Sequence, residues 1–121
     1  MKNILLIEDD PFLIDIYTTK LKGSGFLVEV ASQGEEAVSK VKEKPFDLVL
    51  LDIVLPKIDG WEILRQIKAE SKLKDLKVII LSNLSQKEEV EKGMNLGADK
   101  YLIKAHYTPS EVVEEIKKVL G

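Results

Sequence analysis

Five short apolar runs, separated by longer segments with helical periodicity, constrain the fold of this chain more than any other feature of its sequence. Apolar residues fall at positions 14, 17 and 21 of the first intervening segment and at positions 112, 116 and 119 of the last, which places them on one helix face in each case. The short runs between these segments are typical of buried strands. The chain is therefore expected to contain five strand–helix units. The expected strands are Ile4–Ile7, Phe26–Ala31, Leu48–Leu51, Val78–Leu81 and Tyr101–Ile103.

Signals for the start and the end of helices lie between the apolar runs. Pro11 and Pro109 stand where a first helical residue is expected, because the N–H that proline lacks would have no partner there. Gly23, Gly25 and Gly97 are placed to end helices. Four pairs of residues fit a capping box or its Asp variant: Ser32 with Glu35, Asp59 with Glu62, Ser85 with Glu88, and Thr108 with Glu111.

The character of the strands predicts how the sheet is built. The first, third and fourth runs are apolar throughout, as expected of parallel strands that are covered on both faces. The second run partly alternates, which suits an edge strand. Repeated strand–helix units with right-handed crossovers predict an α/β fold, a doubly wound five-stranded parallel sheet with five helices on its two faces. The 121 residues suit one domain over 1–121, and no linker-like tract indicates a second one.

Charge and residue types exclude several classes of function. The formal net charge of −3 gives the domain no general attraction to nucleic acid or to an anionic membrane. The chain has no cysteine, which excludes disulfides and thiolate sites, and His106 alone cannot build a multi-histidine zinc site. No apolar segment has the length of a membrane helix, and the N-terminus is too short in apolar residues for a signal peptide. We therefore expect a cytoplasmic protein.

Charged side chains follow the first, third and fifth expected strands, a serine ends the fourth, and only the uncharged Ser32 follows the second. In open parallel sheets the functional crevice lies at the carboxyl ends of the strands, so these side chains are expected to meet there. The residues concerned are Glu8, Asp9 and Asp10 after the first strand, Asp52 after the third, Ser82 at the end of the fourth, and Lys104 after the fifth.

This set of side chains favours phosphoryl chemistry at a magnesium site. Asp9, Asp10 and Asp52 would repel one another in a partly buried site, and Mg²⁺, which prefers oxygen ligands, would relieve the repulsion. Asp52 can act as a nucleophile toward phosphorus. The metal and Lys104 would neutralise the oxygens of the transferred group, and Ser82 could donate a hydrogen bond to one of them.

Four sequence pieces that carry these residues resemble the receiver domain of bacterial response regulators, the CheY-like family. They are "LLIEDD", "DLVLLDIVLPKIDG", "VIILS" and "GADKYLIK", in the family's order and at its spacings. The resemblance covers the whole chain, so we expect a receiver domain without an output domain. It also implies a flavodoxin-like sheet with strand order 2-1-3-4-5.

The resemblance implies a role for each acid of the site. Asp52 would be the phosphoacceptor, receiving a phosphoryl group from the phosphohistidine of a sensor histidine kinase or from a phosphotransfer protein. Asp9 and Asp10 would hold Mg²⁺ together with Asp52 and the backbone carbonyl of Val54. The domain would catalyse only its own phosphorylation and dephosphorylation, and so would not be an enzyme in the usual sense.

The resemblance also implies a switch and an output surface. Ser82 would be the switch hydroxyl, Lys104 the lysine of the site, and Tyr101 the aromatic residue that turns inward when the hydroxyl moves toward the phosphate. The output surface would consist of the fourth helix, the fifth strand and the fifth helix. A downstream protein would bind there, the domain being a monomer or a phosphorylation-dependent dimer with no direct contact to nucleic acid or membrane.

The sequence departs from the family at two places. Ala105 follows the lysine where the family usually has a proline, often after a cis bond, and a cis bond before a non-proline residue costs about 2.5–4 kcal/mol. The reach of Lys104 is therefore open. Val54 and Leu84 stand two residues after Asp52 and Ser82, where side chains influence hydrolysis of the phospho-aspartate in the family. Neither can orient a water, so we hypothesise slow self-dephosphorylation.

Simpler roles exist for the same residues. Asp10 can be an N-cap before Pro11, alone or in addition to binding metal. Asp52, Ser82 and Lys104 would each be unremarkable singly, and Tyr101 can be a static half-buried aromatic. Two other functions remain open. One is an interaction module that works without phosphorylation. The other is a phosphatase with an aspartyl nucleophile, disfavoured because its second aspartate would have to stand at Val54.

Overall fold

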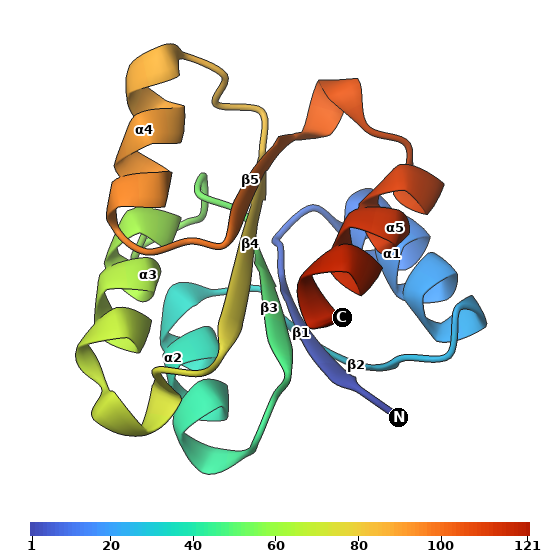
Figure 1. Ribbon diagram of the computed structural model, residues 1–121, viewed down its shortest axis with the longest axis horizontal. Coiled ribbons are helices and arrows are strands. Elements are labelled where there is room, and N and C mark those ends of the chain that lie inside the picture. Colours follow the sequence, from blue (N-terminus) through green and yellow to red (C-terminus); the bar gives the residue numbers. More distant parts are fainter.

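The computed structural model describes residues 1–121 and contains one parallel sheet of five strands in the order β2-β1-β3-β4-β5, with five α-helices (Figure 1). The predicted α/β class, strand order and number of helices are therefore confirmed. The strands are β1 (Asn3–Ile7), β2 (Leu27–Ala31), β3 (Leu48–Leu51), β4 (Lys77–Ser82) and β5 (Lys100–Ile103). The helices are α1 (Pro11–Gly23), α2 (Gly34–Glu43), α3 (Gly60–Ala69), α4 (Lys87–Asn95) and α5 (Pro109–Leu120).

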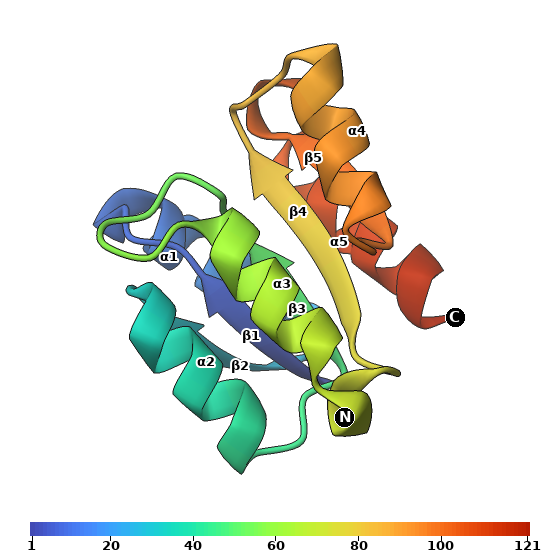
Figure 2. The ribbon, with the colours of Figure 1, turned by 90° about the vertical axis from the view of Figure 1, so that its left-hand side faces the viewer.

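Helices cover both faces of the sheet. Figure 1 shows α1 and α5 on one face, and Figure 2 shows α2, α3 and α4 on the other. Alternate residues of β1 point into two separate hydrophobic cores: Leu5 and Ile7 pack with α2 and α3, while Ile4 and Leu6 pack with α1 and α5. This two-sided burial explains why the central strands are apolar throughout.

The edge strand β2 is attached to α2 by an ion-pair cluster. Glu29 lies in the middle of β2, and its carboxylate accepts hydrogen bonds from Nζ of Lys40 at 3.1 Å and of Lys44 at 2.9 Å. Both lysines belong to the end of α2 or follow it directly. The partial alternation in the sequence of this strand therefore reflects its exposed edge position.

Several predicted helix ends are confirmed. Pro11 and Pro109 are the first residues of their helices. The Asp59 carboxylate accepts a hydrogen bond from the Glu62 N–H at 3.1 Å, and Thr108 and Glu111 form a reciprocal capping box. At the other ends, Gly25 and Gly97 follow α1 and α4 with φ of 92° and 105°, a conformation that glycine adopts without strain. Gly23 instead is the last residue of α1.

Two helices begin one residue later than the sequence indicated. The N-caps of α2 and α4 are Gln33 and Gln86, not Ser32 and Ser85. Two adjacent glutamates lie in the first turn of each helix, and the second of each pair, not the first, accepts a hydrogen bond from the preceding backbone. Glu36 accepts a hydrogen bond from the Ser32 N–H at 3.0 Å, and Glu89 from the Gln86 N–H at 2.9 Å.

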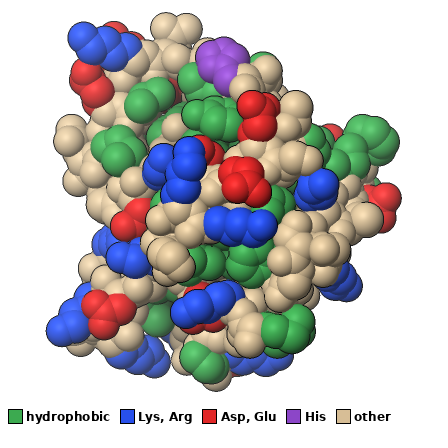
Figure 3. Space-filling model, turned by 45° about the vertical axis from the view of Figure 1, so that its right-hand side comes forward, with side chains coloured by type: hydrophobic (Ala, Val, Ile, Leu, Met, Phe, Trp, Pro, Cys, Tyr) green, Lys and Arg blue, Asp and Glu red, His purple; other side chains and the backbone are tan.

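The charges on the helices are polarised. Glutamates occupy the first turns of α2 to α5, and lysines occupy the last turns of all five helices. Both placements match the helix dipole. Because every helix begins near the carboxyl ends of the strands, the glutamates of the first turns lie toward the cleft and the lysines of the last turns lie toward the opposite end of the sheet. On the face shown in Figure 3, Lys and Arg side chains occur along the lower part and also at the centre and upper left, with acidic side chains among them. No helix combines the length and the hydropathy of a membrane span.

We predict that Glu29→Gln loosens the β2 edge in a pH-dependent way. The hydrogen bonds from Lys44 and then Lys40 lower the pKa of the Glu29 carboxyl. Ionised Glu29 therefore contributes stability above its ordinary pKa, and this contribution is lost as the pH falls through the lowered pKa. Urea unfolding of Glu29→Gln at pH 7 should show a free energy of unfolding lower than that of the wild type by less than about 1 kcal/mol, because the ion pairs are partly exposed.

The same measurement at successively lower pH should show the difference between wild type and Glu29→Gln shrinking to zero. Glu43→Gln is the matched control, because Glu43 lies at the end of the same helix and forms no ion pair. A loss of equal size in Glu43→Gln, or a loss independent of pH, would contradict the assignment to the Glu29 pairs.

Candidate functional site

A cleft of about 340 Å³ opens at the carboxyl ends of β1, β3, β4 and β5, where the sequence placed the site. Polar and charged side chains form most of its wall. The residues that line it are Glu8, Asp9, Asp10, Leu13, Asp52, Val54, Ser82, Asn83 and Lys104. Apart from Tyr101, every candidate site residue of the sequence therefore reaches this cleft.

Asp52 stands where β3 leaves the sheet. Its backbone N–H still donates to the Ile7 carbonyl of β1, so the residue is fixed by the ladder, and only 6% of it is exposed. One carboxylate oxygen, Oδ1, accepts from the N–H of Ile53 at 2.7 Å. On the other side, a Cβ added to Gly60 would lie 2.4 Å from the Asp52 carbonyl oxygen, so α3 can start here only with glycine.

Lys104 joins the ends of three strands. Its Nζ donates to Oε1 of Glu8 at 2.7 Å and to Oδ2 of Asp52 at 2.9 Å. Burial lowers the pKa of the Lys104 ammonium, but the hydrogen bonds to Glu8 and Asp52 outweigh it, so the pKa is raised. The peptide bond to Ala105 is trans, as are all others, and β5 passes into a short 3₁₀ turn over Lys104–His106. Lys104 therefore reaches the acids although Ala105, and not proline, follows it.

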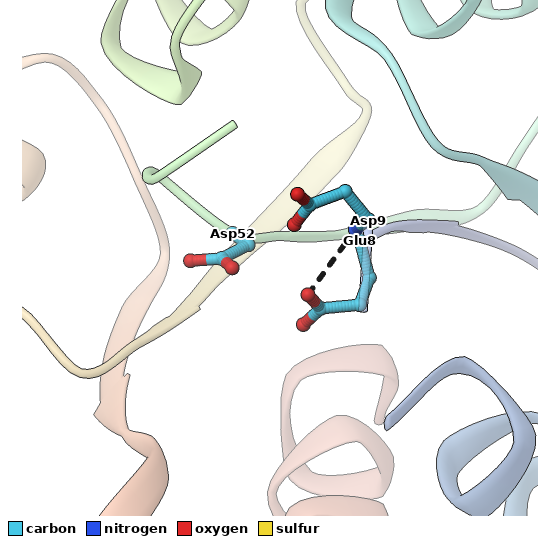
Figure 4. Close-up of side chains that lie close together, drawn as sticks. All are labelled: Glu8, Asp9 and Asp52. Carbon is cyan, nitrogen blue, oxygen red and sulfur yellow. Dashed lines mark hydrogen bonds between the residues drawn. The ribbon is translucent and has the colours of Figure 1, made fainter. Parts of the chain in front are cut away.

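Three carboxylates form a compact group. Oxygens of Glu8, Asp9 and Asp52 lie within 4.8 Å of one another, close enough to share one metal ion (Figure 4). The second oxygen of Glu8 accepts from the N–H groups of Asp9 and Asp10, at 3.2 Å each. Burial raises the pKa of the Glu8 carboxyl, the Asp52 charge adds to this, and the hydrogen bond from Lys104 opposes it. Such an oxygen-only group suits Mg²⁺.

Asp10 is not a member of this group, although the sequence placed it there. Its Oδ1 accepts from the N–H of Phe12 at 2.9 Å and of Leu13 at 3.3 Å, so its carboxylate caps α1. Glu8 takes its place. The Glu8 N–H still donates to the Ala31 carbonyl of β2, so Glu8 lies on the last rung of the β1–β2 ladder, and its side chain turns into the cleft. The sequence signal for this was that Glu8 is the first acid after the strand.

A chain of hydrogen bonds leads from the cleft toward α4. Ser82 is fully buried, and its Oγ accepts from the Leu84 N–H at 3.3 Å. The Leu84 carbonyl in turn accepts from the hydroxyl of Tyr101 at 2.6 Å. The half-buried Tyr101 ring thus lies inward, against the loop that follows β4. Val54, at the rim of the cleft, is 60% exposed.

Comparison with known proteins agrees with this geometry. Residues 4–117 match the family model of the response regulator receiver domain. The chain is 36% identical over 121 residues to the alkaline phosphatase synthesis transcriptional regulatory protein PhoP of Bacillus subtilis, covering 98% of this chain and 48% of PhoP. It is 34% identical over 116 residues to a gliding motility regulatory protein of Myxococcus xanthus, covering 96% of this chain and 15% of that protein.

A solved structure gives the same result. The CheY-like receiver domain protein of Methanospirillum hungatei superposes with a TM-score of 0.90 at 32% identity, covering 99% of this chain and 94% of that one. The chain spans about half the length of PhoP and a smaller share of the Myxococcus protein. The expected absence of an output domain therefore stays a prediction. Because sequence, fold and cleft all agree, the chain belongs to the response regulator receiver domain family of two-component systems.

Proposed function

We propose that this receiver domain accepts a phosphoryl group on Asp52 from the phosphohistidine of a sensor histidine kinase or a phosphotransfer protein. The observation that carries the proposal is the placement of Asp52. Its carboxylate lies at the wall of an open cleft, held between the Ile53 N–H and the Lys104 ammonium, with two further acids beside it. A nucleophile fixed in this way is presented to a donor without a loss of side-chain freedom at the moment of reaction.

The proposed transfer is a displacement at phosphorus. A carboxylate oxygen of Asp52 forms the new P–O bond while the P–N bond to the donor imidazole breaks, and the imidazole nitrogen leaves with the bonding pair. Lys104 is placed to stabilise negative charge on the phosphoryl oxygens. The Ser82 hydroxyl can donate a hydrogen bond to one of these oxygens, since its Oγ now only accepts a hydrogen bond, from the Leu84 N–H. The reaction ends on the protein itself, so the domain acts as a phosphoacceptor.

We place a divalent cation, Mg²⁺, at Glu8, Asp9 and Asp52, with the backbone carbonyl of Val54 as a further ligand. When bound, Mg²⁺ neutralises the carboxylates and the incoming phosphoryl oxygens. Lys104 now supplies the positive charge for Glu8 and Asp52. Glu8 and Asp52 would therefore be shared between the lysine and the cation. A hydrogen bond that Lys104 now donates to one of these carboxylates could then be donated to the phosphoryl group instead.

The proposed output follows the hydrogen-bond chain through Leu84. A Ser82 hydroxyl drawn to the phosphoryl group would change its bond to the Leu84 N–H, and with it the loop that receives the Tyr101 hydroxyl. That loop leads directly into α4. The surface of α4, β5 and α5 would then present a changed shape to a downstream protein, with the domain as a monomer or a phosphorylation-dependent dimer.

Phosphorylation is tested by intact-mass spectrometry after incubation with acetyl phosphate and Mg²⁺. We expect the mass to rise by one phosphoryl group in the wild type and to stay unchanged in Asp52→Asn, which keeps the shape of the side chain but removes the nucleophile. A wild-type protein that gains no phosphoryl group from any small donor would favour an interaction module that works without phosphorylation.

The metal ligands are tested by a matched pair of variants. Glu8→Gln should weaken Mg²⁺ binding by roughly tenfold or more, because it removes one carboxylate from the group. Asp10→Ser should leave Mg²⁺ binding within about twofold, because serine also caps helices. Isothermal titration calorimetry without phosphodonor measures both. The reverse order of the two variants would restore Asp10 to the metal site.

The lifetime of the phospho-aspartate is tested at the rim of the cleft. Val54 is exposed and cannot orient a water, so we expect slow hydrolysis, and Val54→Asn should accelerate it by roughly tenfold, equivalent to about 1.4 kcal/mol. Leu84→Glu should act in the same direction. The decay of the phosphorylated mass after removal of the donor gives the rate. Unchanged decay in both variants would refute the hypothesis that these apolar residues preserve the phosphoryl group.

A further inference from the structure

Gly93 lies in the interior of α4, where glycine is among the least favourable residues for a helix. It is also the one residue of α4 that is buried. The helix lies over β4 and β5 (Figure 2), so this glycine marks the place where α4 packs onto the sheet. Because its φ is an ordinary helical one, its backbone freedom does not explain why glycine stands there.

The explanation lies in the space that a side chain would need. A Cβ atom on Gly93 would lie 2.6 Å from Cδ1 of Ile80 and 2.9 Å from Cδ2 of Tyr101. Carbon atoms of this kind essentially never approach within 3.0 Å, so something would have to move. Ile80 of β4 is fully buried in the core that lies under α2 and α3. The Tyr101 ring is only half-buried, so it is the group that can move away from an added methyl group toward solvent.

The position of β5 allows the Tyr101 ring a second orientation, turned outward toward solvent. β5 is at the edge of the sheet, so no further strand closes that side. In the inward position the hydroxyl donates to the Leu84 carbonyl at 2.6 Å, and the ring lies between the loop after β4 and the backbone of α4. Burial, and then the charge of Glu89 on α4, raise the pKa of Tyr101. The ring thus contacts α4 closely on one side and the cleft loop on the other.

We infer that Gly93 admits the Tyr101 ring beneath α4 and thereby sets the balance between an inward and an outward ring. One methyl group at this position would exclude the inward ring and break its hydrogen bond to Leu84. The consequence for signalling rests on the proposed function, because the ring would carry a change at Ser82 to α4. The steric relation itself does not depend on phosphorylation. A population shift of this kind requires only a contact that differs between the two ring positions.

The test is ¹⁹F NMR of protein labelled with 3-fluorotyrosine, recorded without phosphodonor. The chain has three tyrosines, and Tyr101→Phe assigns the resonance of Tyr101. We expect a solvent-protected Tyr101 signal in the wild type and its loss in Gly93→Ala, with a solvent-exposed signal in its place. Asn95→Ala is the matched control, since it also introduces alanine into α4 but at an exposed position. It should leave the Tyr101 signal unchanged.

A double variant separates the ring from Ile80. In Gly93→Ala with Ile80→Val, the Cδ1 atom nearest to the added methyl group is gone, which removes the strain against the buried core and leaves only the contact with Tyr101. The Tyr101 signal should stay exposed in this protein. A protected signal in Gly93→Ala, or its return in the double variant, would overturn the inference. Because no phosphodonor is present, a failure of Asp52 phosphorylation would leave these results unaffected.

Discussion

The buried contact of Lys104 with Glu8 and Asp52 is the interaction on which the rest of the site depends. Its three members directly follow β5, β1 and β3, so the contact spans the carboxyl end of the sheet across β4. Two carboxylates and one ammonium are all at most one-tenth exposed. Such an arrangement loses much hydration energy and is retained only with good geometry. It leaves one excess negative charge, which is what a cation-binding site requires.

The sequence predicted the elements of the fold well because its strands and helices differ sharply in hydrophobic pattern. It failed where two adjacent residues could perform the same task. The glutamate pairs at 35–36 and 88–89 each offered two candidates for the back-bonding acid, and the second is used because each helix begins one residue later than expected. Among Glu8, Asp9 and Asp10, the choice depends on the rung at which β1 stops pairing with β2, which the sequence does not display. The trans bond before Ala105, in contrast, agrees with the sequence, because a cis bond before a non-proline residue is costly.

The start of α3 provides a second connection between the cleft and α4. Gly60 packs against the Asp52 carbonyl oxygen, and the next residue, Trp61, presents its ring to Lys92 of α4, whose Nζ lies 4.6 Å from the ring centre. A contact between a cation and an aromatic ring at a partly exposed site contributes about 0.5–1 kcal/mol. Lys92 is adjacent to Gly93, so α4 meets both Trp61 and Tyr101 through consecutive residues. Movement of this helix would therefore be felt at both rings together.

The acidic first turns of α2 to α5 and the basic last turns of all five helices place opposite charges at the two ends of the helices and so form a dipole along the helix axes. Its negative end lies at the carboxyl ends of the strands, where the cleft opens. The field there attracts divalent cations toward the cleft before they contact its carboxylates. The dipole also exerts a torque on any charged protein that approaches, and turns the cleft toward positively charged surfaces. Dissolved salt shortens the reach of this field to about 8 Å at physiological ionic strength. Encounter rates with charged partners should therefore respond to salt more strongly than the net charge of −3 suggests.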